Sequence, residues 1–429
     1  MNALFLVHNH KNRGSYFRAL ELARQFVRRG HYVQFAFTSE TRLYRPFYTP
    51  VPLEEATTAP EYGQHPASTR GLPALGANDL TWAEMPCFTM FNARQEGWSF
   101  FDNGWRIRDA LTRKWDVVYA FSHKPCCVLP ALAARARGAR FILDWADWWG
   151  GPEGLYRHCV IPSSGFQSLP YPSRWLRQAV FGAEEWWEPR VPGLADLITL
   201  ISEEYYLHPR APKNLKTKSL VMHSGAPLDS IVPIGKTAAR TALGLQFAPD
   251  AIVLGYVANF HMDEALLIEA FAQLCRRDPR VHLLLAGAPL EVTTPQQHHA
   301  TQGRITHIGW QPFEQMQNFL GAADVLLLPL TDVALDRARY PHKLSDYVAA
   351  GRPVVACDVG ETGRLLRRYH FGKLSPPTAE GFANAIADVI GQPGEWDAWG
   401  IQTRRVAETH FRWDTLADTL LHRIAPLLQ

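Results

Sequence analysis

Short apolar runs and amphipathic stretches alternate along most of the chain. The first apolar run, Ala3 to Asn9, is followed by a polar loop, an amphipathic stretch from Tyr16 to Arg29, and, after Gly30, a second apolar run at Tyr32 to Phe37. A short apolar run is typical of a buried strand, whereas apolar residues at helical spacing predict a helix. The chain therefore opens as a strand–helix–strand unit.

The same alternation returns after an irregular region and continues in a second series. Residues 38–115 are rich in proline, glycine and tyrosine, and their pattern predicts few elements. The strands predicted beyond them are Asp116–Phe121, Arg140–Trp145, Asp196–Ile201, Ser219–His223, Ile252–Val257, Val281–Ala286, Arg304–Ile308, Asp324–Leu330 and Pro353–Cys357. The helices predicted in the second series are Asp263–Arg276, Pro312–Leu320 and Pro341–Ala350.

Two successive α/β series predict two Rossmann-like domains, each with a doubly wound parallel sheet, joined by a linker near residues 224–236. We expect an N-terminal domain at 1–223, a C-terminal domain at 224–410 and a last helix within 411–429. Ligands bind beyond the carboxyl ends of the strands in such sheets, so the cleft between the two domains is the predicted site.

Composition narrows the class of protein. The 429 residues, 47% hydrophobic and 20% charged, indicate a globular protein large enough for two domains. A net charge of +3 is too small to indicate a nucleic-acid-binding protein. No apolar run reaches the roughly 18 residues of a membrane span, and Met1 to Gly14 shows no charged n-region or cleavage site, so we expect no secretory leader. The six cysteines form no C-x-x-C pair, so we expect a reduced, cytoplasmic protein.

The stretch ARYPHKLSDYVAAGRPVVACDVGE, residues 338–361, places charged side chains directly before an apolar strand. Pro341 suits the first turn of a helix and Gly351 its end. Lys343 then lies in the first turn, where the helix dipole disfavours a cation by roughly 0.3–1 kcal/mol. A phosphate at this N-terminus would reverse that sign, and Asp346 could accept hydrogen bonds from a ribose. A solvated lysine and aspartate on an exposed helix face is the alternative.

This stretch resembles the nucleotide-sugar-binding signature of the GT-B glycosyltransferases of the large retaining family 4, P-x-K-x-x-E-Y-x-A-A-G-x-P-V-V-A followed by a D-x-G-G or D-x-G-E turn. The resemblance covers nearly the whole chain. GYVANFHMDEALLIEAF is similar to the first strand and helix of the family's C-terminal domain, ITHIGWQPFEQMQNFLGAADVLLLPL to its base-binding loop, and KNRGSYFRALELARQFVRRGHYV to its opening. FRWDTLADTLL is similar to the closing helix that usually packs back on the N-terminal domain.

The resemblance implies a GT-B fold, two Rossmann-like domains facing across a cleft, and roles for particular residues. Lys343 and the helix N-terminus would hold the donor diphosphate, and Asp346 the ribose. Trp310 would border the base, Gly14 would let the backbone approach the donor, and His123 would face the reacting sugar. The other donor-binding residues that it implies are Asn259, His342, Leu344 and Glu361. A cleft-wall aromatic, an ordinary turn and a structural strand-end histidine are the alternatives for Trp310, Gly14 and His123.

The sequence departs from the family pattern after the first strand of the C-terminal domain. The family usually has an arginine and a lysine there, whereas ANFHMDE offers Asn259, His261 and two carboxylates. Lys343, with Arg337 or Arg339, would then neutralise the diphosphate.

A second departure concerns the carboxylate that the family places eight residues before Asp346. That position is Ala338 here. The role at the sugar hydroxyls is therefore vacant or moves to Asp336 or Asp332. We name Asp336 as a candidate catalytic residue together with His123 and Lys343.

The motif DWADWWGG, residues 144–151, contains two aspartates at the end of a predicted strand. No further ligand completes a metal site nearby, so no metal is predicted. Asp144, Asp147 and Trp148 are instead assigned to the acceptor side, where aromatic faces stack on sugar rings. Core packing is the alternative.

Residues 171–187, YPSRWLRQAVFGAEEWW, mix arginine with tryptophan, leucine and phenylalanine. Such a stretch can make a weak peripheral contact with a membrane if the acceptor is a lipid. A covered surface helix is the favoured alternative.

The resemblance implies a glycosyltransferase that uses a nucleoside-diphosphate sugar, with UDP or GDP, and retains the anomeric configuration. It needs no cofactor and no metal. The acceptor is a carbohydrate, a lipid-linked sugar or a small molecule, and neither it nor the oligomeric state follows from the sequence. A non-catalytic nucleotide-sugar-binding or partner-stabilising protein is the alternative, motivated by the missing basic pair. An NAD(P)-linked dehydrogenase is disfavoured, because HNHKNRGS lacks G-x-G-x-x-G.

Overall fold

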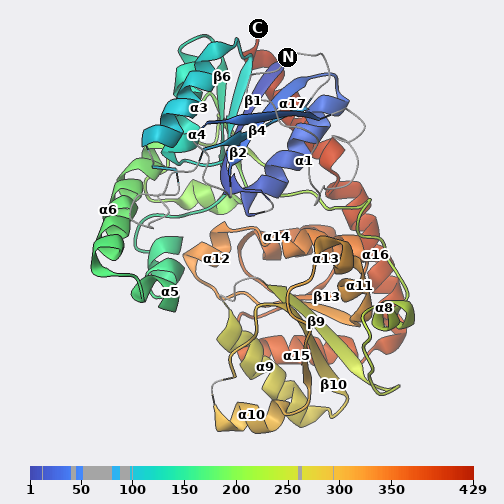
Figure 1. Cartoon of the computed structure of the whole chain (residues 1–429). Coiled ribbons are helices and arrows are strands. Elements are labelled where there is room, and N and C mark those ends of the chain that lie inside the picture. The colour runs from blue at the N-terminus through green and yellow to red at the C-terminus, as the bar shows by residue number, and fades with distance from the viewer. Residues whose placement is uncertain are drawn as a thin grey trace. The chain divides into compact units, whose positions relative to one another are not determined.

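Two separate β-sheets, each with helices packed against it, make up the structure (Figure 1). The structure is a computed structural model and describes residues 1–11, 13–39, 45–51, 80–86, 97–98, 100–258, 263–292 and 294–429. The chain divides into one unit of Met1–His223 with Trp413–Gln429 and a second unit of Ser224–Arg412. We call them the N-terminal unit and the C-terminal unit and describe each by itself.

The sheet of the N-terminal unit has the strand order β3-β4-β2-β1-β5-β6-β7-β8. Its strands are β1 (Asn2–His10), β2 (Tyr32–Thr38), β3 (Phe47–Val51), β4 (Leu80–Met85), β5 (Val117–Ala120), β6 (Arg140–Trp145), β7 (Leu197–Leu200) and β8 (Ser219–Val221). All neighbours pair in parallel except β3 and β4, which are antiparallel. The prediction of an all-parallel sheet is therefore wrong at one edge. β3 and β4 lie within residues 38–115, where the sequence pattern predicts few elements.

The main helices of this unit are α1 (Ser15–Arg28), α3 (Phe100–Thr112), α4 (Pro125–Arg135), α5 (Ser164–Gln167), α6 (Tyr171–Trp187), α7 (Val191–Leu194) and α17 (Trp413–Ile424). Short 3₁₀ or π turns are η2 (Tyr156–Val160), η3 (Glu188–Arg190), η4 (Glu203–Leu207) and η6 (Ala425–Leu427). The apolar residues whose spacing predicts a helix from Tyr16 to Arg29 form the buried side of α1. Tyr16, Leu20, Ala23 and Val27 are each at most 2% exposed.

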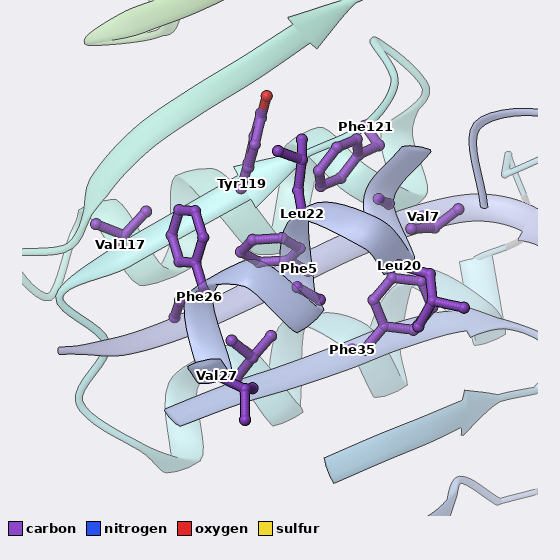
Figure 2. Close-up of a cluster of buried hydrophobic side chains, with 14 of the residues drawn as sticks. Phe5, Val7, Leu20, Leu22, Phe26, Val27, Phe35, Val117, Tyr119 and Phe121 are labelled. Carbon is purple, nitrogen blue, oxygen red and sulfur yellow. The ribbon is translucent and has the colours of Figure 1, made fainter. Parts of the chain in front are cut away.

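Aromatic rings fill the core between α1 and strands β1 and β5 (Figure 2). Phe5 on β1 packs edge-on against Phe26 of α1 and Tyr119 of β5, with ring centres 5.2 and 5.3 Å apart. Ala417 and Leu420 of α17 belong to the same core. The last helix of the chain is therefore part of the N-terminal unit.

The C-terminal unit has a parallel sheet in the order β11-β10-β9-β12-β13-β14. Its strands are β9 (Ile252–Ala258), β10 (Val281–Gly287), β11 (Ile305–His307), β12 (Val325–Leu328), β13 (Val354–Cys357) and β14 (Lys373–Ser375). The helices are α8 (Lys236–Ala242), α9 (Glu264–Arg277), α10 (Pro295–Thr301), α11 (Phe313–Ala322), α12 (Ala334–Ala338), α13 (Lys343–Ala350), α14 (Gly360–Tyr369), α15 (Ala379–Ile390), η5 (Pro393–Glu395) and α16 (Trp396–His410). The five strands predicted in this unit are confirmed, whereas β14 was not predicted.

Both sheets are doubly wound, with helices on both faces, as the sequence predicts. Helix α13 begins at Lys343, two residues later than predicted, because Pro341 lies in the turn before it. The N–H of Leu344 closes that turn on the Pro341 carbonyl, 2.9 Å away.

Candidate functional site

The N-terminus of α13 lies at the edge of the C-terminal sheet where ligands usually bind. Helix α13 leads into the start of β13, so its first residues lie at the carboxyl ends of the parallel strands. His342 is exposed at the N-cap position, and Lys343 is the first helical residue. Gly351 ends the helix in the left-handed conformation, with φ of 62°. The structure therefore confirms Lys343 in the first turn, at the positive end of the helix dipole.

Lys343 carries a charge that no carboxylate neutralises directly. Its Nζ lies 4.2 Å from the ring centre of Tyr256 on β9, and no other described residue gives it a hydrogen bond or ion pair. Desolvation lowers the pKa of Lys343 from 10.5 to about 7; Arg339 acts in the same direction, and Asp263 and Asp346 oppose it. A bound anion would favour the protonated lysine and use the helix dipole at the same time.

Asp346 follows Lys343 by nearly one turn of α13 and is partly exposed. Desolvation raises its pKa from 3.8 to about 7, while the charge of Lys343 opposes this shift. In the described part of the chain no group donates a hydrogen bond to this carboxyl. Its oxygens therefore keep their acceptor capacity, which two neighbouring hydroxyls of a ribose could use.

A second cation, Arg339, is fixed beside this position by two buried carboxylates. Arg339 Nη2 lies 2.7 Å from Asp263 Oδ2, and Arg339 Nε lies 2.7 Å from Asp336 Oδ1. The N–H of Thr331 donates to Asp263 Oδ1 at 2.8 Å, and its hydroxyl lies 2.7 Å from Asp336 Oδ2. Desolvation raises the pKa of Asp336 to about 6; Arg339 opposes this shift and Asp263 adds to it. Asp336 can therefore exchange a proton near neutral pH.

The alternatives Arg337 and Asp332 lie apart from this arrangement. They pair with each other, with Arg337 Nη1 2.8 Å from Asp332 Oδ1 and both side chains well exposed. Of the two arginines considered, Arg339 acts on the charge of Lys343. The structure therefore favours Arg339 and Asp336 over Arg337 and Asp332.

A glycine brings α14 close to α12 at the same edge of the sheet. Gly360 has φ of +50°, and a Cβ on it would lie 2.3 Å from the carbonyl oxygen of Arg337. Glu361, the next residue, is 6% exposed and lies in the first turn of α14, with Oε2 3.3 Å from Arg364 Nη1. Its donor-binding role stays a prediction.

Three further donor-binding predictions differ in how the structure treats them. Trp310 follows Gly309, is 65% exposed and presents an aromatic face to solvent. Leu344 is fully buried and its N–H bonds to the carbonyl of Pro341 in the preceding turn, so its contact with the donor stays a prediction. Asn259 lies outside the described residues, as does the neighbouring His261.

His123 of the N-terminal unit lies in the loop after β5, next to a buried ion pair. Lys124 Nζ is 3.0 Å from Glu184 Oε1 on α6, and both side chains are fully buried. His123 is 2% exposed, with Nε2 3.8 Å from Glu184 Oε2. Burial alone would raise the pKa of Glu184, yet Lys124 and His123 hold it at about 2. The carboxylate therefore stays ionised and faces His123.

Gly14 precedes α1 and has φ of 54°. A Cβ there would lie 2.8 Å from the side-chain nitrogen of Asn9, whose Oδ1 accepts a hydrogen bond from the N–H of Ser15 at 3.2 Å. The glycine is thus required by its backbone conformation and by Asn9. Its approach to a donor stays a prediction.

Two of the three residues assigned to the acceptor side are buried, and the assignment of all three stays a prediction. Asp144 is 1% exposed because it forms a buried ion pair with Arg18, with Nε 3.1 Å from Oδ2. Trp148 is 7% exposed and donates its indole N–H to the carbonyl of Gly150 at 3.0 Å. Asp147 is exposed, and its role stays a prediction. Among the described residues, no group of three or more His, Cys, Asp or Glu side chains could hold a metal ion.

Sequence reasoning missed Lys124 and Glu184. They are 60 residues apart in the chain and have no spacing signal; they meet because α6 packs against the loop after β5. The ion pair of Arg339 with Asp263 spans 76 residues. Asp263 is the first residue of the predicted helix Asp263–Arg276, which was the available signal for it.

Solved structures define the fold. A sucrose-phosphate synthase from Thermosynechococcus elongatus is similar with a TM-score of 0.64 at 16% identity, over 99% of this chain and 98% of that one. HepE from Anabaena, solved in complex with UDP and glucose, also gives 0.64, at 15% identity over 99% of each chain. The chain therefore has the GT-B fold of two Rossmann-like domains, as the resemblance implied.

Sequence comparison identifies the family of the C-terminal unit. Residues 251–392 match the family described as glycosyl transferases group 1, as the resemblance predicts for this part of the chain. The chain is 28% identical over 215 residues to the D-inositol 3-phosphate glycosyltransferase of Mycobacteroides abscessus, covering 47% of this chain and 45% of the relative. It is 23% identical over 305 residues to the putative teichuronic acid biosynthesis glycosyltransferase TuaH of Bacillus subtilis, covering 68% and 70%. The chain thus spans less than half the length of the first relative.

Proposed function

We propose that the protein transfers a glycosyl group from a nucleoside-diphosphate sugar, with UDP or GDP, to a carbohydrate, lipid-linked or small-molecule acceptor. One observation carries the proposal. Lys343, inside the segment that matches the glycosyltransferase family, begins a helix beside the strand ends and has no hydrogen bond or ion pair with any described residue. A cation at the positive end of a helix is unfavourable until an anion joins it, and a diphosphate is such an anion.

The proposed roles follow the charge that develops during transfer. Negative charge grows on the diphosphate as the bond to the sugar breaks, so Lys343, Arg339 and the N–H groups of α13 would stabilise the transition state more than the bound donor. Because these cations supply the neutralising charge, we expect transfer without a metal ion. Asp346 would accept hydrogen bonds from the ribose, and Trp310 would border the base.

Two buried groups are the proposed partners of the reacting sugar. Asp336, with its pKa of about 6, would form a hydrogen bond with a sugar hydroxyl, and His123 would contact the sugar from the N-terminal unit. Retention of the anomeric configuration follows from the resemblance to family 4. The structures of HepE with UDP and with UDP-glucose support a nucleotide-sugar donor by analogy of fold.

A donor screen tests the proposal. A ligand that binds only the native state stabilises the protein and so raises its melting temperature. At a ligand concentration of a hundred times the Kd, the free energy of unfolding rises by about 2.7 kcal/mol. We expect one of the UDP- or GDP-sugars to do so, and the product formed with its acceptor to retain the anomeric configuration by NMR. Turnover should persist in EDTA; loss of turnover that magnesium or manganese restores would refute metal independence.

A non-catalytic nucleotide-sugar-binding protein is the second candidate, because Asn259 and His261 stand where the family usually has its basic pair. Donor binding without hydrolysis or transfer, across a panel of acceptors, would favour this candidate. Release of the nucleoside diphosphate under the same conditions would exclude it.

A further inference from the structure

Helix α6 of the N-terminal unit exposes a stripe of large aromatic side chains. Tyr171 is 72% exposed, Trp175 60% and Trp186 58%. These residues, with exposed Gln178 and Gly182 between them, recur at intervals of three or four residues and so lie along one side of the helix. Figure 1 shows α6 as a long helix at the side of its unit. The favoured expectation of a covered surface helix is therefore corrected.

The opposite side of α6 fixes the helix firmly to its unit. Phe181 stacks on Tyr156 with ring centres 4.0 Å apart, and Glu184 forms the buried ion pair with Lys124. Glu188, directly after the helix, accepts a hydrogen bond from the N–H of Gly150 at 2.7 Å. Since these contacts hold the helix, the aromatic stripe contributes little to its stability and is free to bind something else.

Three arginines lie on α6 or directly after it, of which Arg190 is exposed and Arg174 and Arg177 are half-buried. Arg174, Arg177 and Arg190 have no carboxylate partner among the described residues, and the guanidinium carbon of Arg190 lies 4.2 Å from the ring centre of Trp186. The acidic residues of segment 154–190 are Glu184, Glu185 and Glu188. The first and last are buried, and Glu185 pairs with Arg157 at 3.0 Å.

We propose that α6 docks this protein on the surface of an anionic phospholipid bilayer. Tyrosine and tryptophan place an apolar ring among the acyl chains while the O–H or N–H stays with the headgroups. Arginines beside such a stripe attract anionic headgroups. The stripe covers one side of a single helix, and polar and glycine residues separate its aromatic side chains. It is narrow compared with a protein interface, which typically buries about 800 Å² on each partner, so a protein partner is disfavoured. The inference goes beyond the proposed function and does not depend on it.

Sedimentation with vesicles tests this assignment on the full chain. We expect binding to vesicles of phosphatidylcholine with phosphatidylglycerol and weaker binding to phosphatidylcholine alone. Exchanging Trp175 and Trp186 for serine should weaken binding to the mixed vesicles at least tenfold, since each indole removes apolar area from water. Replacing Arg174 and Arg177 with glutamine should weaken it roughly fivefold for each charge removed.

Ile401, on α16 of the C-terminal unit, supplies the control because it is 70% exposed and apolar but lies outside the stripe. Ile401→Ser should leave vesicle binding unchanged. Circular dichroism checks that each variant keeps native melting, which we expect for the exposed Trp175, Trp186 and Ile401 and must be verified for the half-buried Arg174 and Arg177. Equal binding of wild type and stripe variants, or no binding to anionic vesicles, would overturn the proposal. Self-association that depends on the stripe without vesicle binding would assign it to a second copy of this chain instead.

Discussion

At the scale of single residues, Lys343 links the sequence pattern to the proposed chemistry. Its position in the first turn of α13 follows from Gly351 and the apolar spacing, which the sequence contains. The desolvation of Lys343 does not follow from Gly351 and the apolar spacing. It depends on Tyr256, which belongs to a strand 87 residues earlier in the chain (343 − 256 = 87). A lysine with a pKa near 7 can change its charge when an anion binds.

Donor affinity should depend on pH through this lysine. A bound diphosphate raises the pKa of Lys343 above its free value of about 7, so the complex holds a proton that the free protein loses as the pH rises. Affinity should therefore fall above pH 7, by up to about tenfold per pH unit. Titration calorimetry between pH 6 and pH 9 measures this slope.

Lys343→Arg is the matched control, because arginine keeps its charge over this range. The fall above pH 7 should disappear in this variant. An identical slope in both proteins would show that another group, with Asp346 the first to examine, controls the pH dependence.

The free protein should become more stable when this charge is removed. The folded-state pKa of Lys343 is lowered from 10.5 to about 7, so the unfolded chain binds more protons between these values and stability rises with pH across that window. At pH 7 and below the buried charge is unfavourable. Lys343→Met keeps the apolar stem and should raise the free energy of unfolding at pH 6 by about 1–2 kcal/mol. This is less than the energy equivalent of the whole pKa shift of Lys343, because the side chain is partly exposed.

Urea unfolding without ligand at pH 6 measures this difference. A loss of more than about 1 kcal/mol in Lys343→Met would mean that the ammonium group stabilises the fold. Lys343 would then have a structural role.

At the scale of secondary-structure elements, the junction of α12 and α14 depends on one glycine. Gly360→Ala should cost about 3 kcal/mol or more, since it combines the strain of φ at +50° with a Cβ 2.3 Å from the carbonyl oxygen of Arg337. Gly303→Ala is the control, because φ there is +71° with no atom within 4 Å of the added Cβ, so strain alone should cost about 1–2 kcal/mol. Chemical denaturation compares the two, and equal losses would argue against the close approach.

The buried ion pair that attaches α6 provides a second test at this scale. Glu184→Gln leaves Lys124 buried without a counter-charge and should cost about 3–5 kcal/mol. Glu185→Gln, in the adjacent position, removes an ion pair with the exposed Arg157 and should cost at most about 1 kcal/mol. Thermal and urea unfolding should separate the two variants; a small effect of Glu184→Gln would show that water reaches the pair.

Five of the six strands of the C-terminal unit could be predicted, mostly because they are short apolar runs between polar loops, whereas β14, with the sequence KLS, has no such run. β9 and β13 were placed within one residue at each end. β3 and β4 were not predicted, since an edge strand such as Phe47–Val51, with an interior proline, lacks this signal. Contacts between distant residues, such as Asp263 with Arg339, need the fold itself.

At the scale of the whole molecule, family and fold cover different parts of the chain. The glycosyltransferase group 1 match is confined to residues 251–392, whereas the GT-B fold covers both units. In the N-terminal unit, the burial of Asp144 and Trp148 could not be predicted from a motif of alternating aspartate and tryptophan. No described helix is long and apolar enough to cross a membrane.

The most direct test of the central claim is the affinity of the purified protein for its nucleotide-sugar donor, measured by titration calorimetry at pH 6.5 in wild type and Lys343→Met. If Lys343 holds the diphosphate, losing this charge-assisted contact should weaken binding by roughly 1.5–3 kcal/mol, about ten- to more than a hundredfold. Equal affinity of the two proteins for the donor would contradict the account.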